Sequence, residues 1–192
     1  MSGENTRWEK ADISYRNYVA YLMRKPLPYD LSLIDLLYVS NFKGGNASIQ
    51  EEESSINLKL RKYSDIIRKV AERFGNRNLR DLNEIELKSL QKLSAEFLIL
   101  VRKDSLFRID GFGSSYTSAL LHFHFPTLIP ILDRRVLNGA GINAEINAQG
   151  QVVDIERYYP ELIQYFHREL RNRPEIDLRA LDKELFIKPI AK

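Results

Sequence analysis

The sequence predicts an all-α protein, with one small β-hairpin near residues 142–153. Two observations carry this prediction: apolar residues recur at helical spacing through most of the chain, and turn signals are concentrated in a few places. The chain has 192 residues, of which 44% are hydrophobic. We therefore expect a single helical domain over residues 1–192, made of two lobes that share a core.

The first elements are separated by clear breaks. Residues 15–23 are rich in aromatic side chains and end at two closely spaced prolines, which impose an extended break. Asp30 or Ser32 can cap the next helix, whose apolar run covers residues 33–39. Its end is marked by residues 40–46, a loop with two glycines.

Two long amphipathic helices follow. Residues 56–74 have apolar side chains at helical spacing, and Gly75 is a typical helix stop. Residues 82–101 repeat the pattern and are expected to face the core. Residues 106–136 differ, because they hold the only tightly spaced glycines in a helical setting.

The last part of the chain combines the hairpin with two more helices. Residues 142–147 and 151–153 flank Ala148-Gln149-Gly150, which is a plausible hairpin turn. Two amphipathic helices are predicted over residues 155–171 and 178–186.

Composition excludes several classes of chemistry. Without cysteine there is no disulfide framework, no Cys-ligated zinc or iron–sulfur cluster, and no cysteine nucleophile. His122, His124 and His167 show no pattern with a third ligand, so we expect no metal site. The N-terminal residues lack the apolar core of a signal peptide, and no apolar run approaches a length of about 18 residues. We therefore expect a cytoplasmic protein without membrane contact.

Charge is unevenly distributed along the chain. Residues 56–80 carry two acids, Asp65 and Glu72, against eight basic residues: Lys59, Arg61, Lys62, Arg68, Lys69, Arg73, Arg77 and Arg80. A solvated helix face explains such a run without any partner, and binding of a polyanion needs a second, independent signal.

That signal comes from Gly111-Phe112-Gly113, which is followed by Ser114 and Ser115. An apolar residue, Gly-x-Gly and a helix that opens on small polar residues are typical of a tight turn between two helices. The amides at the start of the second helix can bind a phosphate. Such a hairpin holds a nucleic-acid backbone without reading its bases. A plain helix–helix turn is the alternative.

The wider pattern resembles the helix-hairpin-helix-Gly/Pro-Asp superfamily of DNA glycosylases, the group that includes the 8-oxoguanine and adenine glycosylases. Three features agree in order: Gly111-Phe112-Gly113, the small residues Ser118 and Ala119, and Pro130-Ile131-Leu132-Asp133. The resemblance implies a helix-hairpin-helix motif at about residues 104–124 and a divergent member without an iron–sulfur cluster.

The resemblance also assigns catalytic roles. Asp133 matches the catalytic aspartate, whose carboxylate stabilises positive charge on the sugar as the N-glycosidic bond breaks. An N-cap of the following helix is the alternative role for Asp133. Ser115 stands where branches that also cut the strand carry a lysine, and a hydroxyl cannot form a Schiff base. Tyr116 stands where a small residue is common, so its ring is expected to line the pocket entrance.

Further DNA contacts are expected from the two arginines after Asp133 and from the loop at residues 41–43. Arg134 and Arg135 can clamp phosphates that flank the flipped nucleotide, although Arg135 can instead hold Asp133 in a salt bridge. Asn41 or Phe42 is placed to fill the space of the extruded base, with Lys43 on a phosphate. An ordinary helix-terminating loop is the alternative for these three residues.

Two functions follow from this sequence. The first is a monofunctional DNA glycosylase that releases a damaged or modified base, such as an oxidised purine or a hypermodified cytosine of phage DNA, and leaves an abasic site. The second is a non-enzymatic helix-hairpin-helix DNA-binding module; a helical protein-interaction domain is a third interpretation. We expect double-stranded DNA as the partner, a monomer and no cofactor. The resemblance allows one exception, a monovalent cation at the hairpin.

Overall fold

The computed structural model describes residues 3–45, 47–148, 150 and 152–188. Within these residues the chain forms eight α-helices and one short 3₁₀ helix, which confirms the all-α prediction. In chain order the elements are α1 (Gly3–Leu22), α2 (Leu33–Phe42), α3 (Glu53–Phe74), η1 (Leu79–Asp81), α4 (Glu84–Ile99), α5 (Ser114–His124), α6 (Arg134–Gly139), α7 (Ile155–Asn172) and α8 (Leu178–Ile187).

Local sequence sets where several of these helices begin and end. Ser32, rather than Asp30, caps α2, and its backbone N–H donates to Asp35 Oδ2 over 2.7 Å. Asn83 Oδ1 accepts from the first amides of α4. Gly75 ends α3 with φ +52°, a left-handed value that glycine adopts without strain.

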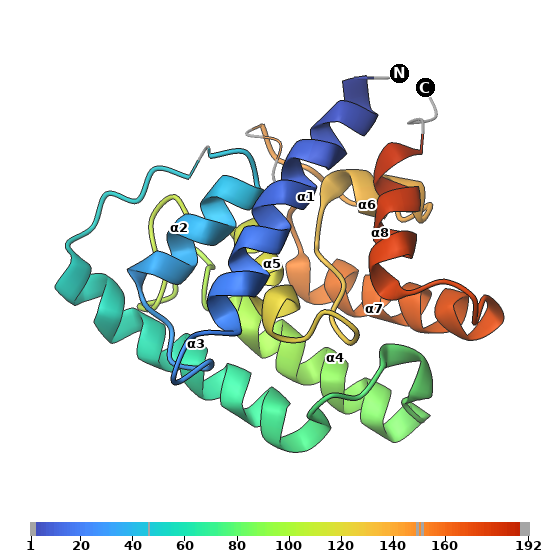
Figure 1. The fold of residues 1–192 in the computed structure, drawn as a ribbon, viewed down its shortest axis with the longest axis horizontal. Coiled ribbons are helices and arrows are strands. Elements are labelled where there is room, and N and C mark those ends of the chain that lie inside the picture. Colours follow the sequence, from blue (N-terminus) through green and yellow to red (C-terminus); the bar gives the residue numbers. More distant parts are fainter. Residues whose placement is uncertain (1–2, 46, 149, 151, 189–192) are drawn as a thin grey trace.

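The helices form two groups around a common core. Helices α2 to α5 pack together, and α6, α7 and α8 pack on their other side, with α4 against α7 as the main contact between the groups (Figure 1). Buried side chains of both groups belong to one cluster. The division into two lobes therefore stays a prediction.

Helix α1 joins the two groups across the top of the molecule. It packs on α2, and its first turns lie beside the end of α8 (Figure 1). The rings of Trp8 and Phe186 have their centres 5.5 Å apart at this junction. No helix within the described residues is both long and apolar enough to cross a membrane.

Two predicted motifs are only partly formed. The hairpin at 142–153 has one antiparallel bridge, between Ile146 and Val152, and the described residues form no strand; Gln149 and Gln151 lie outside them. Of the predicted helix-hairpin-helix at 104–124, the turn and its second helix α5 are present. Residues 104–113 form successive turns instead of a helix, so the complete motif is not confirmed.

Candidate active site

A cleft of about 1430 Å³ lies between α1, the end of α2, the turn before α5, and helices α6 and α8. The predicted site residues come from three segments that are far apart in the sequence, and these segments meet in its wall. All the predicted site residues line it: Asn41, Phe42, Lys43, Gly111, Phe112, Gly113, Ser114, Ser115, Tyr116, Asp133, Arg134 and Arg135. The structure therefore brings the predicted residues together, whatever their roles.

The Gly-x-Gly turn is built by close approach to another part of the chain. Gly111 has φ +81°, and a Cβ at this position would lie 2.1 Å from the carbonyl oxygen of Ser48. The neighbouring Asp110 donates its backbone N–H to Glu51 Oε1 over 2.7 Å. Residue 111 must therefore be glycine because the backbone of Ser48 occupies the space that a Cβ would need.

Phe112 does not contribute its ring to the surface. Its side chain is 1% exposed and lies 5.4 Å from the ring of Tyr116, centre to centre. Any contact of Phe112 with DNA is therefore expected through its backbone, because burying its aromatic ring in the core is strongly favourable. Gly113 differs, since nothing lies within 4 Å of the position of its Cβ.

The start of α5 opens toward the cleft. Gly113 occupies the N-cap position, where no side chain caps the helix, and Ser114 and Ser115 are partly exposed. First-turn amides of a helix are favourable for an anion. The pKa of Tyr116 is raised by burial, against the opposing charge of Lys43, so this neutral phenol lies near Lys43 in the cleft wall.

Buried polar contacts fix the segment that leads to Asp133. Ser118 in α5 donates to the carbonyl of Ser115 and accepts the backbone N–H of Leu132 over 2.9 Å. Tyr159 in α7 donates its hydroxyl to the carbonyl of Pro130 over 2.8 Å. The small polar residue Ser118 therefore fixes the backbone of the segment that leads to Asp133.

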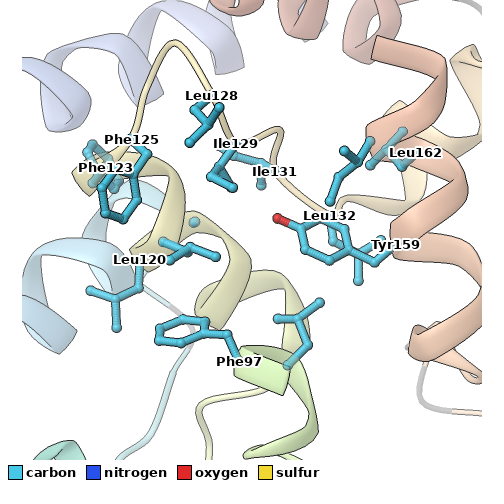
Figure 2. Packing of buried hydrophobic residues seen from close by; sticks show 14 of the residues in the cluster. Phe97, Leu120, Phe123, Phe125, Leu128, Ile129, Ile131, Leu132, Tyr159 and Leu162 are labelled. Carbon is cyan, nitrogen blue, oxygen red and sulfur yellow. The ribbon is translucent and has the colours of Figure 1, made fainter. Parts of the chain in front are cut away.

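Apolar packing reinforces these contacts. Ile129, Ile131 and Leu132 lie between α5 and α7, and the hydroxyl of Tyr159 is directed toward this segment (Figure 2). His122 Nδ1 lies 2.6 Å from the carbonyl oxygen of Ile129. The position of residue 133 is thus determined by two helices rather than by its own loop.

Asp133 fills the N-cap role that the sequence allowed for it and also pairs with Lys43. Its Oδ1 accepts the backbone N–H of Arg135 over 2.9 Å, as the N-cap of α6, and its Oδ2 lies 2.5 Å from Lys43 Nζ. Burial pushes the pKa of this carboxyl upward, but the Lys43 ammonium and the Arg135 amide outweigh burial, so the pKa lies below its ordinary value. Asp133 is an ionised, partly exposed carboxylate at neutral pH.

The two arginines after Asp133 have different positions. Arg134 is exposed and approaches Gly150 across the cleft, where its Nη1 lies 3.2 Å from the position of a Cβ. The guanidinium of Arg135 lies 5.1 Å from the ring centre of Phe186. Asp133 forms an ion pair with Lys43, a residue that the sequence placed on a phosphate, and the charge of Arg135 also lowers the pKa of Asp133.

Helix α2 runs to Phe42, so residues 40–42, which the sequence placed in a loop, form its last turn, and the loop begins at Lys43. This last turn contains one residue that is open to solvent and one that is not. Asn41 is exposed and donates to Ser14 Oγ over 3.0 Å. Phe42 is 8% exposed, and its ring centre lies 5.1 Å from that of Phe123. Phe42 as a wedge in DNA is therefore wrong for this structure, because its ring belongs to the core. Asn46 lies outside the described residues.

The charge of the cleft is mainly positive. Five acids line it, Asp104, Asp133, Asp154, Glu156 and Asp182, against eight basic residues: Lys10, Lys43, Arg102, Lys103, Arg108, Arg134, Arg135 and Arg179. No residue of the basic segment 56–80 is among the lining residues. The strongest run of positive charge in the sequence and the positive cleft are thus different surfaces.

Sequence reasoning missed Arg179 and Asp182 on α8. A signal was available, because Asp182 stands in the apolar stripe formed by Leu178, Leu181 and Leu185, where a core residue is expected.

Among the described residues, no group of three or more His, Asp or Glu side chains is arranged to hold a metal ion.

No family model matches the chain, and no curated protein or solved structure is detectably similar to it.

Proposed function

We propose that this protein is a monofunctional DNA glycosylase, which flips a damaged or modified base out of duplex DNA and hydrolyses its N-glycosidic bond. The observation that carries the proposal is the position of Asp133, an ionised carboxylate in a positively charged cleft that the Gly111–Gly113 turn also lines. An ionised carboxylate stabilises the positive charge that develops on the sugar when this bond breaks.

The cleft also contains groups that can bind the phosphates of the DNA backbone. Phosphates can contact the first amides of α5 next to Gly113 and the exposed Arg134 across the cleft. Asn41 remains the candidate for the space of the extruded base, since it is exposed in the last turn of α2, two residues before Lys43. The volume of about 1430 Å³ is large enough for a flipped nucleotide together with its flanking phosphates.

The expected product is an abasic site rather than a broken strand. Ser115 replaces the lysine of the bifunctional branches, and a hydroxyl cannot form a Schiff base. The amine of Lys43 is paired with Asp133, and an ammonium group held by a carboxylate is not a nucleophile. Oxidised purines and modified pyrimidines, including hypermodified cytosines of phage DNA, are the proposed substrates.

The Lys43–Asp133 ion pair also favours a second candidate function. If Lys43 stays on Asp133 when DNA binds, the carboxylate is neutralised and the cleft binds duplexes without chemistry. The protein would then be a non-enzymatic DNA-binding module.

A panel of duplexes with damaged and modified bases separates the two functions. After incubation with the full chain, hot alkali cuts the strand wherever an abasic site has formed. We expect alkali-dependent cutting of at least one duplex, and a fall of at least about 100-fold for Asp133→Asn, because the transition state loses its charge stabilisation. Asp177→Asn is the matched control, since Asp177 also caps a helix but does not line the cleft.

Three results contradict parts of this proposal. Binding of all duplexes without release of any base favours the non-enzymatic module. Equal activity of Asp133→Asn removes the catalytic role of that residue. Strand cutting without alkali is incompatible with a monofunctional enzyme.

A further inference from the structure

Asp182 is a second carboxyl of the cleft that the proposed reaction does not yet use. It lies on α8 with its side chain 4% exposed, and its Oδ2 accepts from Arg179 Nη1 over 3.2 Å. Its other oxygen, Oδ1, is buried and has no hydrogen-bond partner within the described residues. An unpartnered buried carboxylate oxygen costs free energy, unless the group carries a proton or meets a ligand.

The packing of α8 on α6 places Asp182 near Asp133. The two helices approach closely at Gly139, where a Cβ would lie 2.3 Å from the carbonyl oxygen of Leu185. Burial raises the pKa of Asp182 to about 7, the Arg179 guanidinium opposes this, and the negative charge of Asp133 raises it further while Lys43 lowers it. The two carboxyls thus differ in protonation at neutral pH.

We propose that Asp182 is the proton donor of the cleft, acting on the group that leaves while Asp133 stabilises the reacting sugar. This inference rests on the proposed glycosylase function. A pair of carboxyls whose surroundings push their pKa values apart is the usual arrangement of one acid and one ionised stabiliser.

The step balances as a hydrolysis. As the bond between C1′ and the base nitrogen breaks, its electron pair stays on the base, which takes the proton of Asp182. Water then forms a bond to C1′ and releases a proton that restores Asp182. Asp133 remains ionised throughout and opposes the positive charge on the sugar.

Other titratable groups near Asp182 do not fit this role. The pKa of Tyr15 on α1 is raised by burial, so its phenol is a weak acid. His122 lies next to Tyr15, but burial lowers its pKa to about 4, so its ring is neutral at neutral pH and does not act as an acid there. Arg179 is held between the rings of Trp8 and Tyr15, at 4.0 and 4.5 Å from their centres.

The first test needs no activity. In the full chain with ¹³C-labelled aspartate, we expect one carboxyl signal to titrate near pH 7 and to disappear in Asp182→Asn. The proposal is overturned if every aspartate carboxyl titrates below about pH 5, the ordinary range for this group.

The second test follows the single-turnover rate of base release against pH. The wild-type rate should fall above about pH 7, whereas Asp182→Asn should lose this fall and be about 100-fold slower at pH 6. Asp12→Asn is the matched control, because Asp12 is the exposed carboxylate on the same arginine, 3.1 Å from Arg179 Nη2, and does not line the cleft.

The outcomes separate this inference from the proposed function. An Asp182→Asn variant with the wild-type rate and pH profile overturns the role of Asp182 and leaves the glycosylase intact. If the wild type releases no base, the glycosylase function fails and the proton transfer fails with it, whereas the carboxyl titration still reports on Asp182 itself. Circular dichroism of Asp182→Asn at each pH excludes unfolding as the cause of a lost rate.

Discussion

Helix α3 with the segment after it and the cleft both carry excess positive charge, but they obtain and use it differently. In residues 56–80 the basic residues lie within one short segment of the sequence, and several already have partners in the fold: Lys59 pairs with Glu51, Arg77 with Glu86, and Arg80 donates to the carbonyls of Pro174 and Ile176. In the cleft the basic residues come from several separate segments.

This difference shows that a run of positive charge in the sequence does not by itself identify a DNA-binding surface. Along α3 the positive side chains alternate with a buried apolar face that includes Leu60, Ile67 and Val70, so they cover the outside of an amphipathic helix. The cleft residues would be scattered in any sequence profile. A positive surface for DNA is therefore better sought in tertiary contacts than in local composition.

The largest expected effect is on stability, and it is tested by replacing one glycine from each region. Gly111→Ala should lower the free energy of unfolding by about 3 kcal/mol, because the new Cβ meets the Ser48 carbonyl and φ is positive. Gly75→Ala at the end of α3 should cost only about 1 kcal/mol, since its φ is also positive but the nearest atom is 3.8 Å away. Urea unfolding of both variants measures the difference, and equal losses would remove the idea that close approach builds the cleft.

An intermediate effect is expected from the buried histidine behind the cleft. The pKa of His122 falls to about 4 because burial disfavours its charged form, so the folded state binds fewer protons than the unfolded state between pH 6.5 and 4. Its contribution should therefore make the protein less stable by about 2 kcal/mol on going from pH 7 to pH 5. Asp182, whose pKa is raised, acts in the opposite direction over this range.

Comparison with His122→Asn isolates this contribution, since asparagine can keep the donor to Ile129 but does not titrate. The difference in stability between wild type and variant should change with pH as calculated. A difference independent of pH from 7 to 5 would show that His122 is not buried in its neutral form. Helix α3, which contains no histidine, offers no comparable sensitivity.

The smallest effect compares one exposed arginine from each surface. Arg134→Glu should weaken binding of duplex DNA about 10-fold at moderate salt and reduce its salt dependence, because a phosphate contact is lost. Arg61→Glu on α3 should change the affinity less than about 2-fold, since this residue is exposed but outside the cleft. Fluorescence anisotropy at two salt concentrations measures both; equal losses would mean that DNA lies along α3 as well.

Much of the secondary structure was predictable, because its signals are local. Ser32, Asn83 and Gly75 mark helix ends by their own hydrogen-bonding or backbone preferences. Helix α1 begins well before the aromatic stretch that the sequence emphasised. Its polar first turns carry little periodic signal, and contacts such as Trp8 with Phe186 come from the distant α8.

The site was predictable as a set of residues but not as a set of roles. The spacing from Gly111 to Asp133 identified residues that do meet in one cleft. The sequence assigned Phe42 and Phe112 to DNA because both stand in candidate DNA-binding segments, whereas their rings are buried. Whether an aromatic ring in a loop faces water or the core depends on segments elsewhere in the chain, here α5 and its neighbours.

By itself, the sequence determined most of the helices and the capping of α6 by Asp133, since each depends on residues within a few positions of one another. The glycines marked the turn at Gly111–Gly113, but the close approach of Ser48 that requires Gly111 comes from the tertiary structure. Only the tertiary structure decided that Lys43 pairs with Asp133 and that Asp182 is buried beside them. Protonation and pairing depend on burial and on charges brought in by distant segments, and these exist only after the chain has folded.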